Sequence, residues 1–184
     1  AGASVSSAGD VNGDGFDDLI VGAPGGFGGK AGGQAYVIYG GAPGTDIDLS
    51  RLTAGQGFII KGAASGAQSD RAGWSVSSAG DVNGDGFDDV IVGAPTNEDG
   101  GVKAGEAYVI YGGATGSNIN LTSLTAAQGF ILQGDAAGNW GAGSSVSSAG
   151  DVNGDGFDDV IVGAPNGDEA YVIYGGTTGS NIDP

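Results

Sequence analysis

Short apolar runs alternate with clusters of glycine and polar residues along the whole chain. The runs have few forms: Ser-Val-Ser-Ser-Ala-Gly, then Asp-(Leu/Val)-Ile-Val-Gly-Ala-Pro, then Ala-Tyr-Val-Ile-Tyr-Gly-Gly. Runs of this length that are rich in β-branched and aromatic residues and bounded by Gly or Pro predict strands. Large groups on both faces of the Tyr-rich run predict a strand that is covered on both sides. The pattern therefore predicts an all-β protein of short strands.

The pattern recurs three times, in units that begin near Ala3, Trp74 and Ser144. The first strand of each unit is expected at 4–9, 75–80 and 145–150, and the second at 18–24, 89–95 and 159–165. The third strand is expected at 35–41, 107–113 and 170–176. A single helical turn (within 46–53 and 118–125) and a fourth strand (57–61 and 129–133) follow in two units. We expect blades at 1–70, 71–141 and 142–184, the last without its fourth strand.

The nonapeptide Asp-Val-Asn-Gly-Asp-Gly-Phe-Asp-Asp occurs without change between the first two strands of every unit. Oxygen-bearing side chains stand at positions one, three, five and nine, and the residue at position seven can add a backbone carbonyl. Alternate oxygen ligands on a tightly turned, glycine-containing loop are what Ca²⁺ prefers. The sequence predicts about three Ca²⁺ ions, held by Asp10, Asn12, Asp14, Phe16 and Asp18; Asp81, Asn83, Asp85, Phe87 and Asp89; and Asp151, Asn153, Asp155, Phe157 and Asp159.

Three other kinds of loop share part of this sequence pattern. An EF-hand needs a Glu at position twelve and a following helix, but position twelve is Val21, Val92 or Val162 within an apolar run. A dockerin also continues into a helix and has its two loops close together, whereas these loops lie about 70 residues apart. Asp, Asn and Gly also dominate turns that bind no metal, and this remains the plainest alternative.

Composition narrows the function classes. The net charge is −17, but twelve of the 22 acidic residues lie in the three loops, so most of the acidity belongs to the expected metal sites. The five basic residues are scattered, which argues against nucleic acid as a partner. The chain has no His and no Cys, and no nucleophile–base pair is recognisable, so we do not expect an enzyme. No apolar run approaches the length of a membrane span. Calcium is millimolar outside cells, where loops of low affinity would be filled, so we expect a secreted, extracellular or cell-surface protein of bacterial origin.

The loop joined to Val-Gly-Ala-Pro and followed by a Tyr-rich strand resembles the FG-GAP repeat of integrin α-subunit propellers and their bacterial relatives. The resemblance implies four-stranded antiparallel β-propeller blades, with calcium in the loop between the first two strands and the ligands named above. The Phe-Gly half of the repeat is replaced by Ala1-Gly2, Ala72-Gly73 and Ala142-Gly143. We expect Trp74 or Trp140 to take the place of the missing aromatic side chain.

About three blades are fewer than a propeller needs, and they leave open sheet edges. We therefore expect either further blades from a longer chain or self-association. The leading functional hypothesis is a calcium-stabilised module for adhesion, which binds a protein or glycan through the variable connections 25–34, 96–106 and 166–169. The alternatives are a structural repeat of a surface layer, filament or fibre and, less favoured, a non-catalytic propeller that accompanies a hydrolase.

Overall fold

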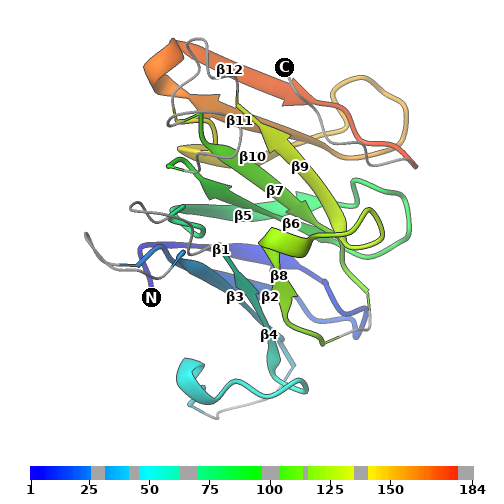
Figure 1. The fold of residues 1–184 in the computed structure, drawn as a ribbon. Coiled ribbons are helices and arrows are strands. Elements are labelled where there is room, and N and C mark those ends of the chain that lie inside the picture. Colours follow the sequence, from blue (N-terminus) through cyan, green and yellow to red (C-terminus); the bar gives the residue numbers. More distant parts are fainter. Residues whose placement is uncertain are drawn as a thin grey trace.

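The computed structural model of the chain describes residues 1–25, 32–41, 46–62, 70–96, 104–113, 116–134 and 141–177. These residues form three antiparallel sheets that lie one above another (Figure 1). The first sheet contains β1 (Ser4–Gly9), β2 (Asp18–Ala23), β3 (Gln34–Ile38) and β4 (Gly57–Lys61); the second β5 (Ser75–Gly80), β6 (Asp89–Ala94), β7 (Glu106–Ile110) and β9 (Gly129–Gln133); the third β10 (Ser145–Gly150), β11 (Asp159–Ala164) and β12 (Glu169–Ile173). The prediction of an all-β fold with four-stranded, propeller-type blades is confirmed, and the described third sheet has three strands.

Each unit begins with the same hairpin in the same register. Val5 lies opposite Val21, as Val76 does opposite Val92 and Val146 opposite Val162. The third strands end at Ile38, Ile110 and Ile173, three residues before the predicted end. They end early because the chain turns there, so that the amide of Gly40 donates to the side chain of Asp18 (2.8 Å) instead of to a neighbouring strand.

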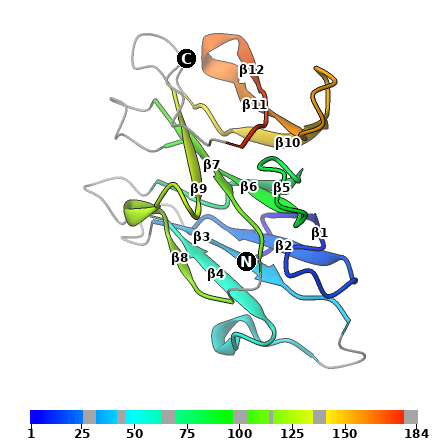
Figure 2. The same cartoon turned by 90° about the vertical axis from the view of Figure 1, so that its right-hand side faces the viewer.

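The predicted helical turns are 3₁₀ turns, η1 (Leu49–Arg51) and η2 (Leu121–Ser123), and a third, η3 (Pro165–Gly167), was not predicted. A two-residue strand, β8 (Ile119–Asn120), precedes η2 and was also missed by the sequence pattern. It belongs to the second unit but pairs parallel to β4 of the first, as Figure 2 shows. The side chain of Asn118 accepts a hydrogen bond from the amide of Ile59 (2.9 Å), so the second unit closes the outer edge of the first sheet.

The first strands of the three units lie side by side, with β5 packed between β1 and β10. In the middle unit every residue of β6 and β7 is buried, which confirms the prediction of a strand covered on both faces. The same prediction is wrong for β12, where Val172 is 47% exposed. The sequences of β7 and β12 are identical, and the difference arises because no described unit packs on the outer face of β12.

The tryptophan expectation is also corrected. Trp74 is 42% exposed, and the guanidinium of Arg71 lies 5.4 Å from the centre of its ring, so it fills no core position; Trp140 lies outside the described residues. Ala72 is fully buried instead, and Gly73 approaches the first sheet so closely that an added Cβ would lie 2.3 Å from the carbonyl oxygen of Gln34. Close backbone contact therefore replaces aromatic packing at the start of the second unit.

Candidate metal centres

The nonapeptide connects the first two strands of each sheet, as predicted, and its glycines have the expected backbone conformation. Gly13 and Gly15 have φ values of 75° and 88°, and their equivalents in the other two loops lie within a few degrees of these values. Positive φ is a conformation that residues with a Cβ resist. It turns the backbone amides of the loop inward, toward the carboxylate at position one.

The aspartate at position one organises the loop. Asp10 accepts hydrogen bonds from the amides of Gly13 (2.8 Å) and Asp14 (3.0 Å) at Oδ1 and from that of Gly15 (2.8 Å) at Oδ2. Asp81 and Asp151 accept the same three bonds in their own loops. These donors hold the pKa of Asp151 below its ordinary value, the amide of Gly156 contributing most.

Positions three and five contact each other. The Nδ2 group of Asn12 donates to Asp14 Oδ2 (3.0 Å), and Asn12 Oδ1 accepts from the amide of Asp14 (2.9 Å). The other oxygen of Asp14 accepts from the amide of Phe16 (3.0 Å). The second and third loops repeat these bonds, so the structure brings together the first, third and fifth positions in every copy.

The aspartate at position nine is the buried member of the set. Asp18, Asp89 and Asp159 are completely buried at the first residue of the second strand. Asp18 Oδ2 accepts from the amide of Val11 (3.0 Å), and Oδ1 accepts from that of Gly40 (2.8 Å), so this carboxylate ties the loop to the end of β3. A carboxylate oxygen can accept two bonds, and each oxygen here receives one of these amides.

Burial makes this position electrostatically unfavourable for an anion. Loss of solvent raises the pKa of Asp18; the two amides oppose the shift, and the nearby charges of Asp14 and Asp10 add to it. The same causes, with burial again the largest, raise the pKa of Asp89 to about 7. A buried carboxylate beside two others is a position that a bound cation would stabilise.

The donor chemistry fits a hard cation, since every candidate side-chain ligand offers oxygen. Within the ranges that the structure describes, however, no three His, Cys, Asp or Glu side chains form a cluster arranged around one metal position. The loop amides are the partners of Asp10 and Asp14 in this arrangement, as described above. The complete ligand sets, including the carbonyls of Phe16, Phe87 and Phe157, therefore remain a prediction.

The sequence pattern missed the role of position eight. Asp88 belongs to the second loop, but its Oδ2 accepts a hydrogen bond from the amide of Asp10 in the first loop (2.7 Å), and its own amide donates to the Asp10 carbonyl (3.2 Å). Asp158 bonds in the same way to Asp81, at 2.9 Å and 3.2 Å. Each loop is thereby linked to the next. The signal was present in the sequence, because all three copies keep an Asp at a position for which the metal hypothesis has no use.

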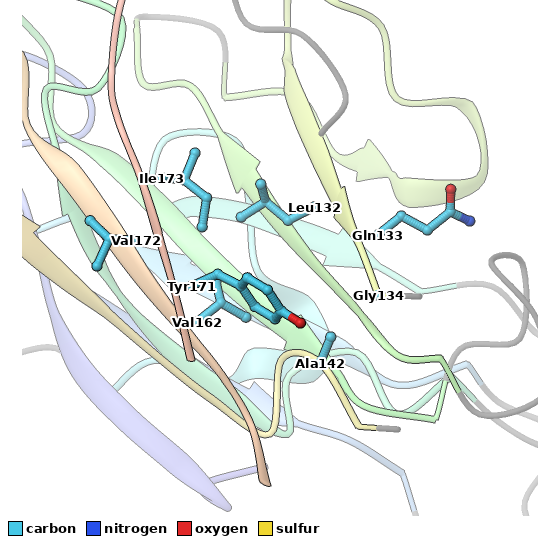
Figure 3. A pocket seen from close by; sticks show the side chains of 8 residues that line it. All are labelled: Leu132, Gln133, Gly134, Ala142, Val162, Tyr171, Val172 and Ile173. Atoms are coloured by element: carbon cyan, nitrogen blue, oxygen red, sulfur yellow. The ribbon is translucent and has the colours of Figure 1, made fainter. Parts of the chain in front are cut away.

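The variable connections are described only in part. Residues 26–31 and 97–103 lie outside the described residues, and the third connection contains η3. An apolar pocket of about 150 Å³ lies between the second and third sheets, lined by residues that include Leu132, Val162 and Ile173 (Figure 3). Between the first and second sheets, Ile119 and Leu121 pack with the equivalents of these pocket residues, which are Ile60, Val92 and Ile110. The pocket is therefore a place where packing is incomplete, and we do not assign it a ligand.

Stacked antiparallel sheets with neighbouring first strands and a repeated loop define a propeller-type repeat protein. The FG-GAP repeat model matches residues 1–38, 72–110 and 142–181, and the chain belongs to this family.

Similar proteins include integrin alpha-PS2 of Drosophila melanogaster, 29% identical over 170 residues that cover 89% of this chain and 11% of that protein. Integrin alpha-7 of Mus musculus is 34% identical over 158 residues, which cover 84% of this chain and 11% of that protein. Phosphatidylinositol-glycan-specific phospholipase D of Bos taurus is 35% identical over 164 residues, with coverages of 85% and 18%. The chain thus spans only a small part of the length of these relatives. None of its described helices is long and apolar enough to cross a membrane.

Proposed function

We propose that this chain is a calcium-binding extracellular module for adhesion, in which each of the three loops holds one structural Ca²⁺. The ligands are those predicted from the sequence: the side chains at positions one, three, five and nine and the carbonyl at position seven. The observation that carries the proposal is the completely buried aspartate at position nine, which lies beside two other acidic side chains in a loop that offers only oxygen donors.

The residues of the loop have separate tasks in this proposal. Asp10 folds the loop by accepting three of its amides, and Asp18 joins the loop to the end of the third strand. A bound ion would supply the positive charge that these buried and clustered carboxylates lack. Because loop oxygens would fill its coordination sphere, the ion would have no open position for a substrate. Its effect would be stability gained by linkage.

We assign the binding of a protein or glycan partner to the variable connections between the second and third strands. Variable loops on a constant scaffold commonly carry recognition, and the similarity to proteins named integrin alpha supports an adhesive role at the cell surface. We propose no catalytic activity for these units, since the aspartates at positions one, five and nine of each loop already accept backbone amides that hold the loop in shape. A second candidate, a repeat of a filament or surface layer, is favoured by the exposed outer faces of the first and third sheets.

Thermal unfolding tests the metal proposal. Calcium should raise the melting temperature of the wild-type chain relative to the same protein in EDTA, whereas magnesium, which tolerates this ligand number poorly, should have a smaller effect. Asp85→Asn in the middle loop should reduce the calcium effect, and Asp168→Asn, an exposed aspartate outside the loops, should leave it unchanged. Identical melting curves in calcium and EDTA would contradict the proposal. Binding to glycan and protein arrays, with electron microscopy of the same sample, separates adhesion from polymer formation.

A further inference from the structure

The three units have nearly the same sequence but different surroundings, and this reveals two complementary faces on each unit. The valine at loop position two is 1% exposed in the first unit (Val11), 2% in the second (Val82) and 56% in the third (Val152). The first residue after the loop shows the opposite order, being 54% exposed in the first unit (Leu19) and buried in the other two. We call the surface that the following unit covers the trailing face, and the surface that the preceding unit covers the leading face.

The contact between these faces occurs twice within the chain, with the same groups. The position-eight carboxylate of one leading face accepts the amide at the start of the preceding loop, as Asp88 does with Asp10 and Asp158 with Asp81. The ring of Phe87 lies against Gly13, where an added Cβ would come within 2.5 Å of it, and Phe157 lies in the same way against Gly84. The amides of Gly113 and Gly176 donate to the carbonyls of Val11 and Val82, both at 2.8 Å.

The leading face of the first unit and the trailing face of the third unit have no described unit packed against them. The leading face of the first unit exposes Val5 (67%), Phe16 (56%) and Leu19 (54%), and Asp17, the position-eight aspartate, is exposed as well. The trailing face of the third unit exposes its own set of large apolar side chains: Val152 (56%), Ile161 (37%), Val172 (47%) and Tyr174 (60%). Gly154, the equivalent of Gly13, has no atom within 4 Å of an added Cβ, so the position that would receive a phenylalanine ring is open.

We propose that these two faces bind each other, so that a second copy of this chain docks head to tail. By continuity with the two internal contacts, Asp17 of one copy accepts the amide of Asp151 of the other, and the ring of Phe16 covers Gly154. The contact buries apolar side chains that are otherwise exposed, and it uses no oxygen that is a proposed metal ligand. Because the two faces differ, the interface is heterologous, and it closes into a ring or continues as a stack according to the rotation between units.

Complementation between two variants tests the proposal in calcium-containing buffer by sedimentation velocity. Leu19→Asp places a charge on the leading face, and Ile161→Asp places one on the trailing face. The wild-type chain should have a mass at least about twofold that of one chain, each variant alone should be monomeric, and an equimolar mixture should form a dimer through the two intact faces. Ala126→Asp adds the same charge to an exposed turn of the middle unit and should associate like the wild type.

A monomeric wild type at the highest soluble concentration would overturn the proposal, and so would association that survives in either variant alone or a mixture that stays monomeric. Phe16→Ser and Tyr174→Ser form a second, milder pair that removes exposed side chains without adding charge, and they should complement each other in the same way. Circular dichroism and melting curves confirm that each variant is folded. A folded, calcium-stabilised chain that fails to associate would refute this inference alone and leave the proposed function intact.

Discussion

Removing the carboxylate of Asp88 should destabilise the chain, whereas the same change at Asp17 should not. Both residues occupy position eight of identical loops, but Asp88 is partly buried and accepts the amide of Asp10 at 2.7 Å, while Asp17 is exposed. A hydrogen bond to a charged group contributes about 1.5–3 kcal/mol, and its loss leaves the amide without its partner. We expect Asp88→Ala to lower the free energy of unfolding by about 2 kcal/mol and Asp17→Ala to change it by less than about 0.5 kcal/mol.

The assay is equilibrium denaturation in calcium-containing buffer, at a concentration low enough that sedimentation shows only monomers. Dilution matters because Asp17 takes part in the association proposed above. The two substitutions remove the same charge from the same loop position, so any effect on metal affinity cancels in the comparison. Asp88→Asn keeps an acceptor oxygen and should fall between Asp88→Ala and the wild type. Equal destabilisation by Asp88→Ala and Asp17→Ala would refute the assignment of Asp88 as a link between units.

Two further predictions concern the loops. Gly84 and Gly154 both have a positive φ (76° and 78°), but an added Cβ would lie 2.4 Å from the Phe157 ring only at Gly84. Gly84→Ala and Gly154→Ala should therefore both destabilise the chain, and Gly84→Ala clearly more. Equal melting temperatures for the two variants would contradict the packing of Phe157 on Gly84. The raised pKa of Asp89, about 7 against an ordinary 3.8, means that the folded metal-free chain holds this proton more tightly than the unfolded chain. The contribution of this group to stability is therefore fully present below about pH 4 and is lost as the pH rises through 7, by at most about 1.4 kcal/mol per unit. Denaturation of the metal-free protein across this range should show a shallower slope in Asp89→Asn than in the wild type; a slope of the same sign stays in the variant because the pKa of Asp18 is also raised.

Much of the fold was predictable because each strand carries its own local signal. The β-branched run after each loop and the Gly-Ala-Pro that ends it place β2, β6 and β11 within a residue or two, and their threefold repetition excludes chance. The strand β8 could not be found in this way. It has two residues, and its partner β4 lies in another unit. The local pattern around Leu121 indicates only a helical turn, which the structure shows as the 3₁₀ turn η2 just beyond β8.

The contacts among positions one, three and five within each loop agree with the spacing of the oxygen-bearing residues, but the contacts between loops could not be predicted from it. Asp17, Asp88 and Asp158 have the same neighbours in sequence, and only the packing of one unit on the next makes two of them links between loops. Likewise, Val11 and Val152 stand in identical nonapeptides, yet one is buried and the other exposed. Local sequence determines the strands and loops of each unit, whereas the burial of its side chains depends on which units pack against that unit.

The central claim is that each of the three aspartate loops binds one calcium ion. Isothermal titration calorimetry of the metal-free chain with calcium measures this directly. We expect three ions per chain in the wild type and two in a variant in which Asp81 and Asp85 of the middle loop are both changed to Asn, with the fold retained. A wild-type chain that is folded and binds no calcium at millimolar concentration would contradict the account.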